Sequence, residues 1–231
     1  MGVFRFKQFS VNDDGATMKV GTDAVLLGAW CPAERATRML DIGTGSGVIA
    51  LMLAQRSGPA AQIDAVELHE RDCRQATENV KNSPWPGKVQ VIHARIQDFQ
   101  ATPYDLIVCN PPFFTQSLLP PDPRRAQVRH DSELNTPDLL QAVRRLLRPE
   151  GLFSLIVPAQ GSAEFIQEAT TAGFHLHRHT HFHTRKHKIA ERSLLTLGLT
   201  PGTPLRDNLL LYEEGDQKSA AYLGLTGDFY L

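Results

Sequence analysis

The segment LDIGTGSGVIALMLA, residues 40–54, joins the two patterns that decide the fold of this chain. A short apolar run ends at three alternating glycines, and a longer apolar run of helical length follows directly. Strand, glycine turn and helix in this order are typical of the first unit of a parallel sheet, and the missing side chains let a ligand approach the backbone. The glycines are Gly43, Gly45 and Gly47, and their spacing differs from the G-x-G-x-x-G of dinucleotide sites.

Apolar runs typical of buried strands recur along the chain and alternate with helical patterns, which predicts strand–helix–strand units with right-handed crossovers. The last two runs are joined by a basic turn and predict an antiparallel hairpin at one edge of the sheet. We therefore expect an α/β, Rossmann-like fold with a seven-stranded, mostly parallel sheet. The expected strands cover residues 37–43, 61–67, 88–94, 104–110, 151–158, 174–184 and 192–199.

The chain divides into a main domain, residues 31–200, and two smaller parts. Residues 1–30 predict a small N-terminal cap made of two short aromatic-rich strands and a helix. Residues 201–231 carry no clear pattern, and we expect them to pack on the domain as a C-terminal tail. Thr136, followed by Pro137 in the first helical turn, is expected to cap the helix before the fifth strand.

The composition is that of an ordinary globular protein of 231 residues, of which 42% are hydrophobic and 21% are charged. The formal net charge of −1 does not by itself indicate a nucleic-acid partner. Three cysteines without short spacing favour a reducing compartment, and no apolar stretch is long enough for a signal peptide or a membrane span. We expect a monomeric, cytoplasmic protein without a membrane partner.

Basic side chains nevertheless gather in two segments. RRAQVRH covers residues 124–130, and RKHKIAER covers residues 185–192. Such segments are either solvated surface or phosphate contacts, and the two together can form a positive face for RNA. The candidate phosphate contacts are Arg124, Arg125, Arg129, Arg185, Lys186 and Lys188.

Five histidines alternate along the first strand of the expected hairpin, at positions 175, 177, 179, 181 and 183. A period of two places them on one face of a strand. Zinc sites rarely take so many ligands from one strand without a cysteine or carboxylate from elsewhere. We therefore expect a polar face that can become cationic, and no metal site.

Acidic side chains follow successive strands on the side where the glycines lie. Asp41 precedes the glycine turn, where a carboxylate repels phosphate and attracts an ammonium group. Glu67 ends the second strand, where an acid can accept both hydroxyls of a ribose. Asp98 follows the third strand, with Phe99 beside it to pack on a flat base. A ligand with an amine, a ribose and an adenine but no phosphate fits this pocket, and S-adenosylmethionine has these parts.

The segment YDLIVCNPPFF, residues 104–114, ends a buried strand with an amide, two prolines and two aromatic rings. Pro111 and Pro112 cannot donate to a sheet ladder, and they keep the preceding residues out of helical geometry. The strand therefore ends in a rigid corner that displays the Asn110 carboxamide.

The motifs DIGTGSG, DAVE, QDF and NPPFF together resemble those of class I S-adenosylmethionine-dependent methyltransferases. The proline motif resembles the branch that methylates amino groups: adenine N6, guanine N2 or the glutamine amide of release factors. The N-terminal FRFKQFSV and MKVGTDAVLLGAW and the closing DFYL resemble the bacterial tRNA(Val) (adenine-37-N6)-methyltransferase family, which modifies the adenine next to the anticodon. This resemblance covers nearly the whole chain and implies a class I methyltransferase fold, S-adenosylmethionine as cofactor and tRNA as partner.

The resemblance also implies a role for the corner. The Asn110 side-chain oxygen and the Pro111 carbonyl can accept the hydrogens of the target amine, which frees its conjugated lone pair for the methyl carbon. Phe113 can stack on the base once the base leaves its neighbours. Many adenine and glutamine methylators carry tyrosine at the Phe113 position, and guanine enzymes often carry histidine at the Phe114 position. Phe113 keeps the ring without the hydroxyl, and Phe114 disfavours guanine. The alternative is an rRNA guanine-N2 or a protein-glutamine N5 methyltransferase.

Two hypotheses from other classes stay open at this point. A nicotinamide-dependent oxidoreductase shares the α/β fold and an acid at Glu67, but the glycine spacing and Asp41 count against it. A non-catalytic RNA-binding module can use the basic segments but has no need of the proline corner. The expected catalytic residues are Asn110, Pro111, Pro112 and Phe113, and the expected cofactor-binding residues are Asp41, Gly43, Gly45, Gly47, Glu67, Asp98, Phe99 and Asn110.

Overall fold

The computed structural model describes residues 2–14, 16–111 and 134–231. The strands of its central sheet are β3 (Arg38–Ile42), β4 (Gln62–Glu67), β5 (Val89–His93), β6 (Tyr104–Cys109), β7 (Leu147–Pro158), β8 (His175–Arg185), β9 (Arg192–Gly198) and β10 (Leu205–Tyr212). Their order across the sheet is β10-β8-β9-β7-β6-β3-β4-β5. Strands β3 to β9 correspond to the seven that the sequence predicts.

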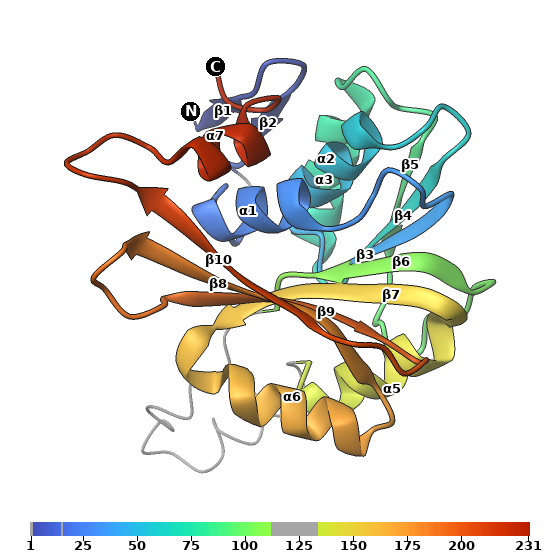
Figure 1. Cartoon of the computed structure of the whole chain (residues 1–231). Helices are drawn as coiled ribbons and strands as arrows, with labels where there is room; N and C mark the ends of the chain where they lie inside the picture. The colour runs from blue at the N-terminus through green and yellow to red at the C-terminus, as the bar shows by residue number, and fades with distance from the viewer. Residues whose placement is uncertain (1, 15, 112–133) are drawn as a thin grey trace, which may run out of the picture.

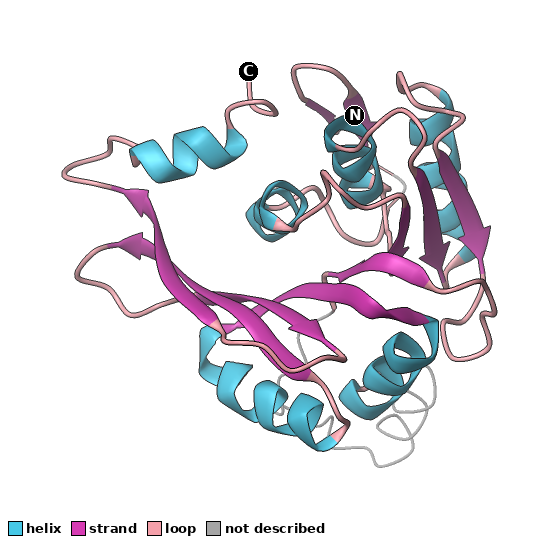
Figure 2. Ribbon diagram, turned by 45° about the vertical axis from the view of Figure 1, so that its right-hand side comes forward, coloured by secondary structure: helices cyan, strands magenta, loops and turns pink. Residues whose placement is uncertain are grey.

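Helices cover both faces of the sheet (Figures 1 and 2). They are α1 (Thr22–Trp30), α2 (Val48–Arg56), α3 (Glu70–Lys81), α5 (Thr136–Leu146), α6 (Ser162–Thr171) and α7 (Ala220–Thr226), with a short 3₁₀ turn η1 (Ala159–Gly161) before α6. Helices α1, α2 and α3 lie on one face and α5 and α6 on the other, with one apolar cluster under each set. Along β3, Met39 belongs to the first cluster and Leu40 to the second, as the two-residue period of a strand requires.

The parallel strands place their carboxyl ends along one edge of the sheet. Strand β3 pairs in parallel with β4 and β6, β4 pairs with β5, and β6 pairs with β7. Strand β9 runs antiparallel between β7 and β8, so β8 and β10 again run parallel to β7. The segments that follow β3, β4, β6, β8 and β10 therefore all leave from this edge, termed the carboxyl edge, where ligands bind in open α/β sheets.

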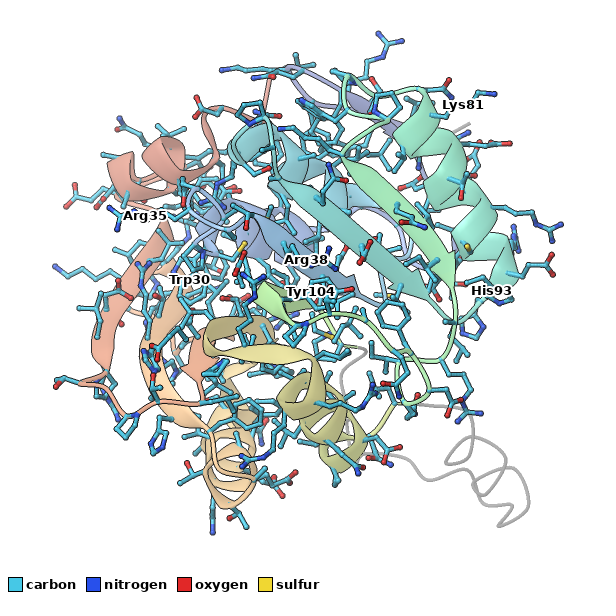
Figure 3. The ribbon with its side chains drawn as sticks, turned by 90° about the vertical axis from the view of Figure 1, so that its right-hand side faces the viewer. Trp30, Arg35, Arg38, Lys81, His93 and Tyr104 are labelled. Carbon is cyan, nitrogen blue, oxygen red and sulfur yellow. The ribbon has the colours of Figure 1, made fainter. Side chains whose placement is uncertain are left out.

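The opposite end of the sheet, termed the amino edge, is held by paired charges. The Arg38 guanidinium lies over the Tyr104 ring, 5.1 Å from its centroid (Figure 3). The Asp64 carboxylate accepts the Tyr104 hydroxyl at 2.5 Å and lies 3.5 Å from the Arg38 guanidinium. Asp105 accepts the Arg38 amide at 2.8 Å and pairs with Arg148. These contacts join β3, β4, β6 and β7 at the end of the sheet away from the glycine loop.

Strands β1 (Val3–Arg5) and β2 (Ser10–Asn12) form a separate antiparallel hairpin, as expected of the N-terminal cap. Aromatic side chains join this hairpin to the end of the chain. The Phe6 ring lies 6.5 Å from the Phe229 ring and 6.4 Å from the Tyr230 ring, measured between centroids. The two termini therefore lie together on the α1 side of the sheet (Figure 1).

The segment after residue 200 differs from the expected tail. It contributes β10, which pairs in parallel with β8 and makes an eighth strand, followed by α7. Leu209 of this strand is buried in the apolar cluster on the α1 side, which holds β10 against β8.

The start of α5 also differs in one detail. The cap is Asn135, whose side chain accepts the Asp138 amide, and Thr136 is the first helical residue. The proline in the first turn is as the sequence predicts. Asn135 is as good a cap as threonine, so the shift by one residue changes the boundary and not the helix.

Candidate active site

The glycine loop between β3 and α2 borders free space. Gly43, Gly45 and Gly47 have φ angles of +69°, +56° and +84°, in the left-handed region where any side chain is strained. A methyl group added at Gly43 or Gly45 would meet no heavy atom within 4 Å, so a ligand can approach the backbone there. At Gly47 it would touch Ala76 at 3.4 Å, so this glycine also lets α3 pack against the start of α2.

Glu67, the last residue of β4, faces this loop. Its Oε2 accepts the Gly45 amide at 2.9 Å, and its Oε1 accepts the His69 amide at 2.9 Å. The residue is only 6% exposed, so its carboxylate has a fixed direction. A carboxylate offers about four acceptor positions, so each oxygen keeps the capacity to accept one hydroxyl of a ribose.

Asp41 lies beneath the glycine loop and is fully buried. Its Oδ2 accepts the Thr44 hydroxyl at 2.6 Å and the Ala50 amide at 3.2 Å, while its Oδ1 has no hydrogen-bond partner among the described residues. Burial raises the pKa of the Asp41 carboxyl from 3.8 to about 7, against the opposing effect of the bonds from Thr44 and Ala50. An ammonium group at Oδ1 would supply the missing partner and favour the charged carboxylate.

The segment after β5 brings Asp98 and Phe99 to the carboxyl edge. The Asp98 side chain is 80% exposed, and Phe99 packs against the apolar cluster on the α5 face. Arg145 of α5 donates to the Ile96 and Gln97 carbonyls, both at 3.0 Å, and a third bond goes to the Phe99 carbonyl. Arg145 therefore holds the shape of this segment. The sequence does not indicate this contact, because no local motif links a helix arginine to carbonyls in a distant loop.

Asn110 and Pro111 leave β6 at the carboxyl edge. In the sheet β6 is the neighbour of β3, with Cys109 opposite Ile42. Asn110 is therefore one strand away from the start of the glycine loop, a spacing of about 4.8 Å between strands. The remaining residues expected here and in the first basic segment, Pro112, Phe113, Arg124, Arg125 and Arg129, lie outside the described residues.

The turn between β8 and β9 carries the other basic candidates at the carboxyl edge. Arg185 is already engaged: its guanidinium lies 2.6 Å from the Asp216 carboxylate and 5.2 Å from the centroid of the Tyr212 ring. Lys186 and Lys188 are exposed. Arg185 thus joins this turn to the β10–α7 connection, whereas Lys186 and Lys188 face solvent.

A buried asparagine, Asn79 of α3, ties the glycine loop to the N-terminal cap. Its Nδ2 donates to the Ser46 and Asn12 carbonyls, both at 2.8 Å, and its Oδ1 accepts the Asn12 amide at 3.0 Å. Asp72 of the same helix accepts the Thr17 amide at 2.9 Å. The cap is therefore part of the support of the glycine loop, a contact that no local pattern in the sequence indicates.

The alternating histidines bond across strands. His177 donates to the Thr200 carbonyl at 2.9 Å, and His179 bonds the Ser193 hydroxyl at 2.9 Å. Burial, followed by the charge of His181, lowers the pKa of His179 to about 4, so this position stays neutral and the expected cationic face is interrupted. Within the described residues no group of three or more His, Cys, Asp or Glu side chains could hold a metal ion.

Among the helices that the structure describes, none is long and apolar enough to cross a membrane. The cysteines Cys31, Cys73 and Cys109 are all free, and Cys31 and Cys109 are buried.

Known proteins with similar sequences identify the family. A family model described as the methyltransferase small domain matches residues 16–168, which is more than half of the chain. The tRNA1(Val) (adenine(37)-N6)-methyltransferase of Aeromonas hydrophila is 47% identical over 228 residues, which are 99% of this chain and 97% of the relative. The protein of the same name from Tolumonas auensis is 42% identical over 228 residues, which are 99% of this chain and 96% of the relative.

Solved structures share the fold. A protein from Agrobacterium tumefaciens described as a predicted O-methyltransferase superposes with a TM-score of 0.67 at 20% identity, over 90% of this chain and 96% of that chain. A 16S rRNA N2 G1207 methyltransferase from T. thermophilus, solved in complex with AdoMet and guanosine, has a TM-score of 0.59 at 20% identity, over 86% of this chain and 50% of that chain. Identity this low supports the fold alone, and the α/β methyltransferase fold expected from the motifs is confirmed.

The geometry fits the cofactor that the motifs imply. Open backbone at Gly43 and Gly45, an unpartnered oxygen on Asp41 and spare acceptor capacity on Glu67 match an amino acid group and a ribose. The full-length matches confirm the resemblance read from the motifs and exclude the oxidoreductase and the non-catalytic RNA-binding module. The chain belongs to the tRNA1(Val) (adenine(37)-N6)-methyltransferase family, a family of S-adenosylmethionine-dependent enzymes.

Proposed function

We propose that this protein transfers the methyl group of S-adenosylmethionine to N6 of adenine 37 in tRNA1(Val). The observation that carries the proposal is the placement of Asn110 one strand away from the glycine loop, in a chain that matches its relatives over 99% of its length. An amine at Asn110 and a methyl donor on the loop would lie close enough for direct transfer. The relatives are named for adenine 37, which favours adenine over guanine N2 or a protein glutamine.

Groups that follow three strands hold the cofactor. The open glycine loop borders its amino acid part, the Asp41 carboxylate faces its ammonium group, and Glu67 accepts its two ribose hydroxyls. Asp98 accepts a hydrogen bond from the adenine amine, and Phe99 packs on the adenine ring. S-adenosylmethionine supplies an electrophilic methyl group, so the chain has to contribute position and charge.

Asn110 and Pro111 prepare the target amine, whose lone pair is delocalised into the adenine ring. The Asn110 Oδ1 and the Pro111 carbonyl each accept one of its hydrogens, so the nitrogen turns towards tetrahedral geometry and its lone pair points at the methyl carbon. As the new N–C bond forms, the C–S bond breaks, and the nitrogen then loses a proton to water because the methylated cation is acidic. Fixed acceptors of this kind bind the transition state more strongly than the ground state.

Exposed lysines at the carboxyl edge, Lys186 and Lys188, bind tRNA phosphates, and the basic residues 124, 125 and 129 are further candidates. Phosphate contacts position the RNA, while adenine 37 has to leave its stack to reach Asn110. Phe113, next to the corner, stacks on that base. We further propose that the protein acts as a monomer, together with its tRNA in the cytoplasm.

Mass spectrometry of nucleosides from purified tRNA1(Val) tests this function. A strain that lacks the gene should lose N6-methyladenosine at position 37, and the wild-type gene should restore it. Asn110→Ala should not restore it, although the variant accumulates as a folded protein. An unchanged modification in the strain without the gene would contradict the proposal, and so would the loss of a methyl group from rRNA or from a protein glutamine instead.

A further inference from the structure

A cavity at the far side of the carboxyl edge is not used by the proposed reaction. It has a volume of about 380 Å³ and lies where the end of β10, the start of α1 and helix α7 meet. We name it the outer pocket and define it by four rings and one cation of its lining: Phe4, Tyr212, Lys218, Tyr222 and Tyr230. Its size falls within the range of about 300–1,000 Å³ found for small-ligand sites.

The lining of the outer pocket joins flat rings to a positive charge. Lys218 Nζ lies 5.6 Å from the centroid of the Tyr222 ring and 5.3 Å from that of Tyr230. Tyr212 pairs with Lys218 across the turn that leaves β10, and the Arg185 guanidinium lies over the Tyr212 ring. Aromatic rings with cations nearby are the surfaces on which proteins stack unpaired bases.

Acidic residues in the same turn argue against a phosphate as the occupant. Glu213, Glu214 and Asp216 are exposed there. Arg185 neutralises Asp216 at 2.6 Å, which leaves two carboxylates in the turn. Like charges would repel a phosphate, whereas a base is uncharged and brings hydrogen-bond donors of its own.

The outer pocket is too far from Asn110 to hold the target base or the cofactor. Tyr212 ends β10 and Asn110 follows β6, and three strands, β8, β9 and β7, lie between β10 and β6. Four spacings of about 4.8 Å put roughly 19 Å between these two points along the carboxyl edge. One RNA hairpin can reach both points, whereas a single adenine cannot.

We propose that the outer pocket holds a second unpaired base from the tRNA loop that carries adenine 37. The proposal rests on the function proposed above and adds a contact that selects the RNA rather than the amine. The base stacks on Tyr212 and Tyr230, and Lys218 contacts its ring acceptors. Because the loop is then fixed at two points, the target base enters the site at Asn110 in one orientation.

The kinetics of two variants test the pocket with unmodified tRNA1(Val). Tyr212→Ala should raise KM for the tRNA by roughly fivefold to a hundredfold, the range expected for the loss of one base–aromatic stack, and Lys218→Gln should raise it less. The value of kcat and the affinity for S-adenosylmethionine should not change. Lys81→Gln is the matched control, because Lys81 is an exposed lysine in the last turn of α3, which runs back from the carboxyl edge (Figure 3).

A second measurement separates a base from other occupants. A set of tRNAs is compared, each with one abasic nucleotide at a different loop position. At one position, the loss of the base should raise KM for wild type and for Lys81→Gln but not for Tyr212→Ala. The proposal would be overturned if each abasic position raised KM equally in all three proteins. It would also be overturned if both pocket variants had the KM of wild type for intact tRNA1(Val). If wild type itself transfers no methyl group to tRNA1(Val), the proposed function fails. If wild type is active and both pocket variants keep its KM, only the proposal for the outer pocket fails.

Discussion

The two ends of the central sheet use acidic side chains in opposite ways. At the amino edge, Asp64 contacts side chains of neighbouring strands, because its Oδ2 accepts the Tyr104 hydroxyl and lies 3.5 Å from the Arg38 guanidinium. At the carboxyl edge, Asp41 leaves one buried oxygen without a partner among the described residues, and Glu67 accepts two backbone amides with capacity to spare. Both ends lie in one sheet, yet the acid at one end meets side chains, and the acids at the other end border the open glycine loop.

This comparison shows that the partners of an acid, and not its type, decide its role. Asp64 and Glu67 lie on the same strand, three residues apart. Asp64 meets a cation and a phenol from neighbouring strands, so its contacts stabilise the fold. Among the residues that the structure describes, Glu67 meets backbone amides of nearby loops, so its remaining acceptor positions are available to a cofactor. Changes at the carboxyl edge should therefore affect function, and changes at the amino edge should affect stability.

The largest functional effect is expected at the corner after β6. Asn110→Ala should lower the single-turnover rate of methyl transfer by about 10²–10³-fold, the usual cost of losing one preorganised acceptor. Asn110 is half-buried and lies beyond the strand, so its truncation should leave the fold and cofactor binding largely intact. A quench assay with labelled cofactor and unmodified tRNA measures the rate. Asn110→Asp keeps an acceptor and should be impaired but measurable, whereas near-normal turnover of Asn110→Ala would show that the corner is only structural.

The next effect should separate the two acids of β4. Glu67→Ala should weaken S-adenosylmethionine binding by roughly 1–3 kcal/mol, because hydrogen bonds to a charged acceptor are lost. Asp64→Ala is the matched control on the same strand: it should lower the melting temperature, since Tyr104 and Arg38 lose their partner, and leave cofactor affinity unchanged. Calorimetric titration and thermal unfolding measure the two quantities. Equal losses of affinity in both variants would contradict the division of roles between the two edges.

The pH dependence of cofactor binding should report on Asp41. Burial raises the pKa of this carboxyl to about 7 in the free protein, and an ammonium group binds its ionised form. Affinity for S-adenosylmethionine should therefore fall about tenfold for each pH unit below the pKa. Asp41→Asn should bind weakly and without this dependence. A wild-type affinity that stays constant between about pH 5.5 and about pH 8 would show that Asp41 does not face the ammonium group.

Fold stability should respond to the same carboxyl with the opposite sign. Between its ordinary pKa of 3.8 and the raised value of about 7, the folded protein holds a proton that the unfolded chain has lost. The contribution of Asp41 to the free energy of unfolding therefore decreases as pH rises through this window. Comparison of wild type with Asp41→Asn in denaturant titrations at several pH values isolates this contribution.

The smallest effect is expected at the turn between β8 and β9. Replacing Lys186 and Lys188 by glutamine should lower the slope of log affinity against log salt by about 0.7 for each lysine that contacts a phosphate of single-stranded RNA. Arg185→Gln should leave the slope unchanged, because the Asp216 carboxylate already lies 2.6 Å from the Arg185 guanidinium. Filter binding of tRNA at several salt concentrations provides the slopes. If Arg185→Gln alone changed the slope, Arg185 and not the two lysines would be the phosphate contact.

Short-range contacts explain why the glycine loop and the two acids beside it could be recognised in the sequence. The glycine loop requires positive φ angles, which leave a visible signature of alternating glycines. Asp41 bonds Thr44 three positions later, and Glu67 bonds the amide of His69 two positions later. The periodicity of strands and helices predicted the order of the seven strands along the chain for a similar reason, because each pattern is contained in one short segment.

Long-range contacts explain what the sequence did not show. Asn79 bonds Asn12, 67 positions earlier, and Arg145 bonds the Ile96 carbonyl, 49 positions earlier. Strand β10 pairs with β8 although β9 lies between them in the chain, and the engagement of Arg185 depends on a turn 31 positions later. None of these pairs has a local motif, so a single sequence without a structure cannot reveal which distant residues meet.

Removal of the target amine from the RNA tests the placement of the chemistry most directly. Two tRNA1(Val) molecules are compared, one with adenine at position 37 and one with unsubstituted purine, which lacks the exocyclic amine. The first should accept one labelled methyl group, located at N6 of position 37 by mass spectrometry, and the second should accept none although it binds with similar affinity. Methyl transfer to the purine-containing tRNA, or to another position of the adenine-containing one, would contradict the assignment of the amine to the corner at Asn110.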